Sequence, residues 1–171
     1  LRTLGFEVTE FDPRKEDLSS IPNISPDIIF NALHGRFGED GLIQGLLEIY
    51  KIPYTHSGVL ASSLAMDKVF SKKIFESSGI KCTYGEVCHL KDFALSQAIN
   101  SPYVIKPINE GSSVGVRIIY NEEDKVKFLR SDDWHYGNNV LVEKYIPGKE
   151  LTVAIFDDRA IGVTEIVYNS K

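Results

Sequence analysis

The sequence predicts an α/β protein whose second half has α+β character. In the first half an apolar run, a glycine-rich turn, a one-sided helix and a further apolar segment follow one another, which is the order of a βαβ unit. In the second half the expected strands alternate polar and apolar residues, which favours an antiparallel sheet with one open face. The 171 residues, 43% of them hydrophobic, suffice for one domain or two small ones.

The elements of the first half are predicted from local signals. Residues 1–5 resemble the last turn of a helix closed by a glycine, and a strand is expected at residues 6–11. Residues 12–26 contain three prolines, which suits a loop or a short irregular helix. The apolar run 27–33 is typical of a buried parallel strand. A glycine-rich turn then leads into an amphipathic helix, and a further strand is expected at residues 52–55.

The second half is expected to begin near Gly58, where the pattern changes. Asp67 has the character of an N-cap for a helix that ends at Gly79 and turns Val69, Phe70, Ile74 and Phe75 inward. The elements predicted beyond it are strand 83–88, helix 92–100, strands 103–106 and 116–120, helix 122–130 capped by Asn121, strand 140–145, and strands 151–156 and 161–168 joined at a hairpin tip, 157–159.

Charge and composition exclude several classes of protein. The net charge is −5, and no basic cluster exceeds Lys72-Lys73, so a nucleic-acid partner is not expected. No apolar run approaches the roughly 20 residues that span a bilayer, and no signal-peptide pattern is seen, so a cytoplasmic protein is expected. Cys82 and Cys88 indicate neither a disulfide framework nor a zinc site. Neither a Ser/His/Asp arrangement nor an HExxH motif is present.

The segment 104–116 is built like a phosphate clamp between two strands. Its glycines let the backbone approach a ligand, and Ser112 and Ser113 can donate to phosphate oxygens, while Lys106 supplies a positive charge. The segment matches neither a P-loop nor a dinucleotide fingerprint, and no helix follows it. The alternative is an ordinary hairpin turn, with Lys106 at the edge of a sheet.

Other charged residues are candidates for the same ligand. Lys68 lies in the first turn of a predicted helix, where the helix dipole disfavours a cation unless an anion is bound nearby; the alternative is a solvated lysine. His34 follows a buried strand, at the mouth of a βα loop where ligands of α/β sheets bind. The other histidines, His56, His89 and His135, are interpreted as surface or core residues.

The strand 140–145 and the turn after it carry a further set of charges. Glu143 and Lys144 end the strand, and Glu150 follows the Pro147-Gly148 turn. A strand that ends this way can offer backbone groups to an adenine edge and a carboxylate to a ribose. The alternative is that these are ordinary exposed charges at a sheet end.

A set of motifs, taken in order, resembles the D-alanine:D-alanine ligases of the ATP-grasp superfamily. The resemblance covers nearly the whole chain and implies a partial Rossmann-like pre-ATP-grasp domain (residues 1–57), a central ATP-grasp domain with an antiparallel sheet (58–145) and the start of a third domain (146–171). The motifs are Ala32-Leu33-His34-Gly35, Gly38-Glu39-Asp40-Gly41, Gln44-Gly45 through Pro53-Tyr54-Thr55, Ser57-Gly58, Met66-Asp67-Lys68, Val104-Ile105-Lys106-Pro107, Glu110-Gly111-Ser112-Ser113-Val114-Gly115 and Glu143-Lys144.

The resemblance also implies an activity and roles for residues. ATP would phosphorylate one D-alanine, and a second would attack the acyl phosphate, giving D-alanyl-D-alanine for peptidoglycan synthesis. ATP and Mg²⁺ (or Mn²⁺) are the implied cofactors, and a homodimer is expected. The implied roles are His34 and Ser112 in catalysis; Lys68, Lys106, Gly111, Ser112 and Ser113 at the phosphates; Glu143, Lys144 and Ile146 around adenine; and Glu150 at the ribose.

Other parts of the family pattern are missing from the sequence. These are the early glutamate-bearing loop, the lid, and the late residues that bind the metals, which are expected downstream of residue 171. The chain is therefore expected to be truncated at both ends and inactive by itself. A ligase that makes D-alanyl-D-lactate or D-alanyl-D-serine is the alternative within this chemistry, and a nucleotide-binding ATP-grasp module without ligase activity is the alternative outside it.

Overall fold

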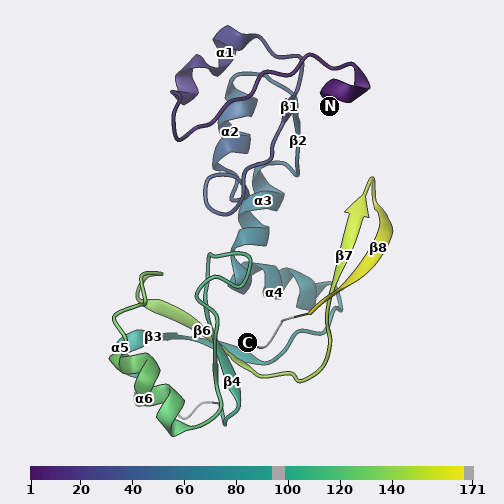
Figure 1. Ribbon diagram of the computed structural model, residues 1–171. Helices are drawn as coiled ribbons and strands as arrows, with labels where there is room; N and C mark the ends of the chain where they lie inside the picture. Colours follow the sequence, from purple (N-terminus) through teal and green to yellow (C-terminus); the bar gives the residue numbers. More distant parts are fainter. Residues whose placement is uncertain (94–98, 168–171) are drawn as a thin grey trace. The chain divides into compact units, whose positions relative to one another are not determined.

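The computed structural model describes residues 1–93 and 99–167, which form two compact units. The first unit comprises Leu1–Ser77 with Ile108–Val114, and the second comprises Ser78–Pro107 with the chain from Gly115 onward. Figure 1 follows the elements along the chain. The domain boundaries after residues 57 and 145 remain predictions.

The first unit contains a parallel pair of short strands and a set of helices. Strand β1 pairs with β2 in parallel, with Ile29 opposite Tyr54, and α2 lies between them in the sequence, so the predicted βαβ order is confirmed. Gly5 closes the first helical turn with a left-handed φ of 87°, also as predicted. The elements are 3-10 helices Arg2–Leu4 and Leu18–Ser20, α1 Ile21–Ile24, β1 Ile29–Phe30, α2 Leu42–Ile49, β2 Tyr54–Thr55, α3 Val59–Met66 and α4 Lys68–Ser77.

Two expectations for this unit are wrong, and one helix was not predicted. Residues 6–11 are not a strand, because the sheet described here contains only β1 and β2 and offers them no partner. The run 27–33 is not buried, since Ile28 and Phe30 are 56% and 62% exposed. Helix α3 was not predicted, because its small and apolar residues are not confined to one face and give no helical periodicity.

The glycine-rich turn before α2 is held closely against α3. Gly41 has a φ of 95°, and a Cβ atom there would lie 2.9 Å from the Val59 carbonyl oxygen, so only glycine fits without a shift. Ser63 Oγ donates to the Asp40 carbonyl at 2.8 Å. Behind the turn, Leu47 and Gln44 of α2 are almost fully buried.

Helix α4 begins as its sequence predicts. Asp67 Oδ1 accepts hydrogen bonds from the amides of Val69 (2.9 Å) and Phe70 (3.0 Å), so Asp67 is the N-cap. The sequence predicts four buried apolar side chains on this helix; Val69 is partly buried, and the prediction is wrong for the other three. Phe70, Ile74 and Phe75 are 41–53% exposed, because no described layer covers that face.

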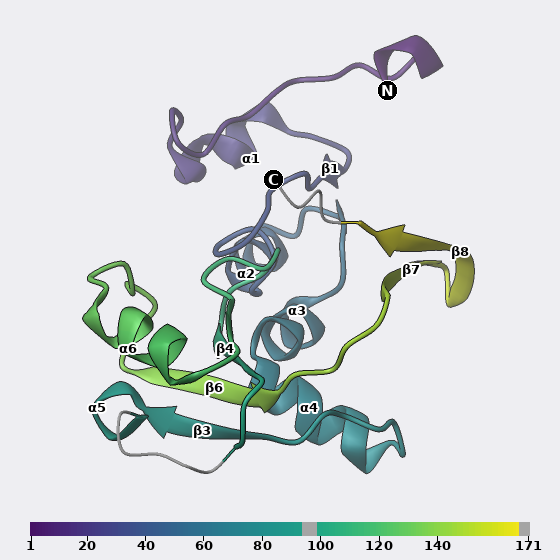
Figure 2. The ribbon, with the colours of Figure 1, turned by 60° about the horizontal axis from the view of Figure 1, so that its bottom comes forward.

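The second unit is built on an antiparallel sheet of order β3-β6-β4-β5. Figure 2 shows β3 and β6 side by side, with α6 beside the sheet. The antiparallel prediction is confirmed. The predicted helix 92–100 is observed as α5 up to Phe93, and residues 94–98 lie outside the described part. The elements are β3 Gly85–His89, α5 Leu90–Phe93, β4 Tyr103–Pro107, β5 Arg117–Ile119, α6 Glu122–Arg130 and β6 Asn139–Lys144.

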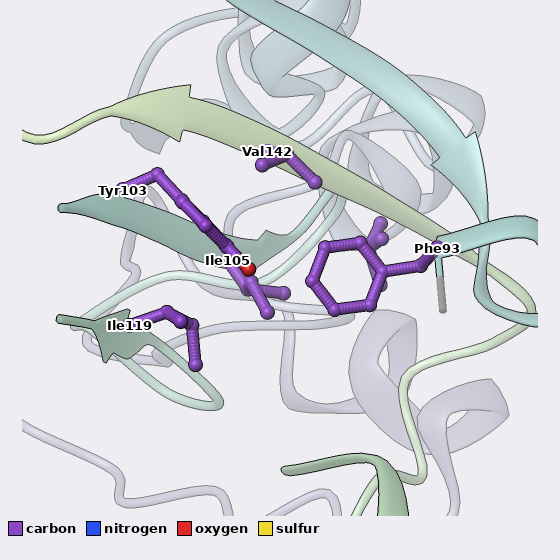
Figure 3. Close-up of a cluster of buried hydrophobic side chains, with 6 residues drawn as sticks. Phe93, Tyr103, Ile105, Ile119 and Val142 are labelled. Carbon is purple, nitrogen blue, oxygen red and sulfur yellow. The ribbon is translucent and has the colours of Figure 1, made fainter. Parts of the chain in front are cut away.

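One face of this sheet carries the core. Ile105 of β4 lies opposite Val142 of β6, and both are buried. Figure 3 shows Phe93 of α5 pointing toward Ile105. Phe128 of α6 packs against Phe93 with ring centroids 5.8 Å apart, so both helices cover the same face. The buried cluster comprises Phe93, Tyr103, Ile105, Ile119, Val140 and Val142.

Two further predictions about this unit are confirmed. Asn121 caps α6, its Oδ1 accepting from the Asp124 amide at 3.0 Å. Strands β7 (Glu150–Phe156) and β8 (Arg159–Ile166) form an antiparallel hairpin. Asp157 and Asp158 at its tip both have positive φ, as a type I′ turn requires. Every residue of both strands is exposed.

Candidate functional site

The glycine-serine loop lies between two antiparallel strands, β4 and β5, as predicted. At its tip the Val114 amide donates to the Gly111 carbonyl at 3.0 Å, and Ser112 and Ser113 have φ of 48° and 59°. This is a type I′ turn without glycine at its two central positions, which is uncommon for L residues and places backbone strain at the tip of the loop. Both serines are exposed, so their hydroxyls are accessible.

The returning end of the loop is packed against aromatic side chains. At Gly115 φ is 71°, and a Cβ atom would lie 2.6 Å from the Tyr136 ring and 2.7 Å from Pro107. Tyr136 contacts Trp134, which contacts Phe128 of the core, each edge to face. Gly115 therefore allows the backbone to approach the Tyr136 ring and not a ligand. At Gly111, by contrast, nothing lies within 4 Å of an added Cβ atom.

Lys68 lies at the beginning of this loop. Its amide donates to the Ile108 carbonyl at 3.0 Å, and its Nζ donates to the Glu110 carbonyl. Asn109 Nδ2 also donates to Asp67 Oδ2 at 3.1 Å. The first half of the loop is thus attached to the N-terminal end of α4, and the Lys68 ammonium is held next to Gly111.

A hollow of about 350 Å³ opens beside Lys68, within the first unit. Its size is in the range of small-molecule sites. Two predicted residues, Lys68 and Gly111, line it. The other lining residues are Glu39, His56, Ser57, Ala61, Ser62, Ala65, Met66 and Glu110. Sequence reasoning had not selected Glu39 or His56 as site residues, and the only signal for either was the place of Glu39 in the glycine-rich turn.

His34 does not line the hollow, but it is connected to it. Its side chain is 89% exposed, and its Nδ1 lies 3.9 Å from Glu39 Oε1. The other oxygen of Glu39 accepts from the Gly35 amide at 2.5 Å. Glu39 therefore joins the turn that carries His34 to the wall of the hollow.

Lys106 and Glu143 form an ion pair in the second unit. Lys106 Nζ donates to Glu143 Oε2 at 2.6 Å, and the two side chains are 29% and 5% exposed. They lie on neighbouring strands, because Glu143 is opposite Val104, two residues before Lys106, and side chains two apart share a face. Sequence reasoning gave the two residues separate roles, whereas the structure pairs them.

The remaining predicted residues lie at the end of β6 and beyond it. The Lys144 amide donates to the Tyr84 carbonyl at 3.0 Å, and the Lys144 carbonyl accepts from Thr83 Oγ1 at 3.2 Å, so residues 83–84 occupy its backbone groups. Ile146 is 63% exposed, and Glu150 is the first residue of β7. The adenine and ribose roles of these residues remain predictions.

Among the described residues, no three His, Cys, Asp or Glu side chains come together in a way that could hold a metal ion. No helix among residues 1–93 and 99–167 is long and apolar enough to cross a membrane.

Comparisons with known proteins identify the family. The family described as "D-ala D-ala ligase C-terminus" matches residues 80–171, and the one described as "D-ala D-ala ligase N-terminus" matches residues 7–57. A D-alanine--D-alanine ligase of Rhodospirillum rubrum is 48% identical over 174 residues, which is 100% of this chain and 57% of that protein. The chain belongs to the D-alanine–D-alanine ligase family. It spans about half the length of the curated relatives it matches.

Solved structures of ligases have the same fold. A D-alanine--D-alanine ligase from Bacillus anthracis complexed with ATP superposes with a TM-score of 0.71 at 30% identity, covering 91% of this chain and 53% of that one. The VanG D-Ala:D-Ser ligase from Enterococcus faecalis superposes with a TM-score of 0.66 at 28% identity, covering 81% and 43%. The predicted family and the ATP-grasp fold are therefore confirmed, while the roles of individual residues remain predictions.

Proposed function

We propose that this chain is the ATP-binding part of an enzyme that ligates two D-alanines to D-alanyl-D-alanine for peptidoglycan synthesis. The observation that carries the proposal is the arrangement around Lys68: its ammonium is held on the loop carbonyl of Glu110, beside a hollow large enough for a small ligand. Support for the substrates comes from the R. rubrum relative, 48% identical over the whole chain.

In this proposal the loop and Lys68 bind the phosphates of ATP. The exposed hydroxyls of Ser112 and Ser113 donate to phosphate oxygens, and Lys68 adds a charge-assisted hydrogen bond, which is stronger than a neutral one. A type I′ turn held by one backbone hydrogen bond presents both serines on the same tip. Ser112 and His34 are the residues assigned to the reacting carboxylate, which ATP converts to an acyl phosphate before the second amine displaces phosphate.

The second unit is assigned to the rest of the nucleotide. Lys106 is the second phosphate-binding lysine, and its ion pair with the nearly buried Glu143 restricts the directions its ammonium can take. Glu143, Lys144 and Ile146 are assigned to adenine, and Glu150 to the ribose. These assignments rest on the motif order and on the placement of all four residues along one stretch of chain.

The proposal has further parts that follow from the family. Mg²⁺ or Mn²⁺ would neutralise charge on the phosphates, and no residue of the described part is assigned to it. The enzyme is proposed to be cytoplasmic and homodimeric, with ATP and D-alanine as its small-molecule partners. The domains are proposed to divide after residues 57 and 145.

A full-length protein that contains this chain tests the activity. We expect phosphate release from ATP with D-alanine alone, and mass spectrometry should identify D-alanyl-D-alanine. A ligase for D-alanyl-D-lactate or D-alanyl-D-serine would instead need D-lactate or D-serine for full turnover; the likeness to the VanG D-Ala:D-Ser ligase supports only the D-serine case. Nucleotide binding without any phosphate release would favour a binding module.

The assignment of Lys106 has its own test in the full-length protein. Lys106→Ala should weaken ATP binding markedly in calorimetry, because a charge-assisted contact is lost. Lys127→Ala, which removes the same charge from an exposed pair on α6, is the matched control and should leave ATP affinity unchanged. Equal ATP affinity of wild type and Lys106→Ala would contradict the assignment.

A further inference from the structure

His56 lies in the hollow beside Lys68 and has no role in the function proposed above. It follows β2 directly and lines the same cavity as Lys68 and Gly111. Its Nδ1 lies 3.1 Å from Gln44 Nε2 and 3.4 Å from Ser62 Oγ. One ring nitrogen is therefore directed at α2 and α3. His56 is an exposed residue, and Nε2 lies on the other side of its ring.

The buried amide of Gln44 decides which nitrogen of His56 carries the proton. Gln44 is fully buried, and its Nε2 donates to the Gly38 carbonyl at 2.8 Å. Because a carbonyl can only accept, the amide nitrogen must face Gly38, and flipping the amide would set two oxygens against each other. The second hydrogen of the same nitrogen is then available to His56.

An amide nitrogen cannot accept a hydrogen bond, so His56 Nδ1 must be the acceptor. A proton on Nδ1 would point at the Gln44 amide hydrogen. The Ser57 carbonyl lies 3.4 Å from Nδ1, a longer contact than that of the Gln44 amide nitrogen at 3.1 Å, and it accepts from Ser62 Oγ at 3.1 Å. The network thus selects a neutral imidazole with its proton on Nε2.

The other end of Gln44 supports a specific role for this residue. Within the described part of the chain, its Oε1 is buried without a hydrogen-bond partner. Buried polar groups are nearly always satisfied, and the exceptions call for an explanation such as a functional constraint. Holding the His56 ring in one tautomer is such a constraint.

We propose that His56 is a further ligand-binding residue of this hollow, which donates its Nε2–H to an anionic oxygen bound beside Lys68. The oxygen belongs either to a nucleotide phosphate or to the carboxylate of the amino-acid substrate. A neutral donor orients such an oxygen, while Lys68 supplies the charge. The inference rests on the proposed function, because the anion is one that Lys68 and the loop would bind.

Nuclear magnetic resonance of the full-length protein with ¹⁵N-labelled histidine tests the tautomer directly. Near pH 8, where an ordinary imidazole is neutral, we expect His56 to show a protonated Nε2 and a bare Nδ1. Two probes are then added to separate samples. One is a non-hydrolysable ATP analogue together with Mg²⁺, and the other is D-alanine. A shift of the Nε2 signal with one of them supports the proposal and identifies the source of the oxygen. The opposite tautomer, or no shift with either probe, overturns it.

Two variants separate ligand binding from a structural role. His56→Phe keeps a ring but removes the donor, and we expect about a tenfold rise in the KM of the substrate that shifts the Nε2 signal. His56→Gln retains a donor and should recover most of the loss. The matched control is His135→Phe, at an exposed residue of the second unit, with an unchanged KM. Equal losses in His56→Phe and His56→Gln would overturn the proposal.

Failure of this inference can be distinguished from failure of the proposed function. If the full-length protein forms no D-alanyl-D-alanine, the proposed function is wrong. The tautomer and the response of Nε2 to each probe are measured without turnover and still decide the role of His56.

Discussion

Replacing Lys106 by methionine removes the cation that lies 2.6 Å from Glu143 Oε2 and keeps a side chain of similar length. The Glu143 carboxylate is only 5% exposed, so water cannot fully replace the lost ammonium. We expect the antiparallel sheet of the second unit to lose stability, by about 2–3 kcal/mol. The companion variant Glu143→Gln removes the negative charge of the same ion pair.

The expected coupling between Lys106 and Glu143 follows from the distance between their charges and from their burial. Two unit charges 2.6 Å apart attract by about 6 kcal/mol at an effective dielectric constant of about 20. Removing a carboxylate and an ammonium from water costs several kcal/mol, which offsets most of that attraction. A double-mutant cycle of Lys106→Met and Glu143→Gln should therefore give a coupling of about 1–3 kcal/mol.

Amide hydrogen exchange of β4 and β6 is the appropriate assay, because it reports the opening of this sheet alone. The exposed pair of Lys127 and Glu123, 2.9 Å apart on α6, is the matched control, with an expected coupling of about 0.3–0.5 kcal/mol. The coupling of Lys106 and Glu143 should also decrease less on adding salt, since a buried pair is less screened. A coupling no larger than that of the control pair would show that burial does not strengthen the ion pair of Lys106 and Glu143.

Three further predictions concern single side chains. Gly115→Ala should destabilise the protein by about 1–3 kcal/mol, because the new methyl overlaps the Tyr136 ring; the melting temperature should stay unchanged in Gly162→Ala, where a Cβ meets nothing within 4 Å. Asn121→Ala should speed amide exchange in α6, because loss of the N-cap destabilises the helix by about 1 kcal/mol. Unchanged exchange would contradict the role of Asn121 as the cap. Burial raises the pKa of Tyr103 to about 12. The unfolded chain therefore releases this proton first, near pH 10, and stability should fall between about pH 10 and 12 in wild type but less in Tyr103→Phe.

Local sequence patterns determined much of the second unit. Asn121 before an amphipathic run predicts α6 and its cap, and the polar-apolar alternation of strands predicts the antiparallel sheet. Aspartates between two strand patterns predict the β7–β8 hairpin. The cap and the hairpin were predictable because their decisive interactions join residues close together in the sequence, and the sheet type was predictable because alternation is a property of each strand by itself. The order of the motifs along the chain was sufficient to predict the family, and the family in turn predicts the fold.

The same reasoning failed where a layer or a partner decides the outcome. Residues 6–11 have the composition of a strand but no neighbouring strand in the described part. Helix α3 has no apolar stripe, and its position depends on the close approach of Val59 to Gly41. A short apolar run is buried only if another layer covers it, and the exposure of Phe30 shows that no layer within the described part of the chain covers this one.

The identity of the chemical groups and their order along the chain, which define the family, can be read from the sequence. Which of these groups meet depends on the tertiary structure. Lys106 and Glu143 are 37 residues apart and Lys68 and Glu110 are 42 apart, and their contacts arise from the register of β4 on β6 and from the path of the loop over α4. The pairing of His56 with Gln44 likewise depends on how α2 and β2 pack. Such distances result from the summed packing of many residues, so no local pattern encodes them.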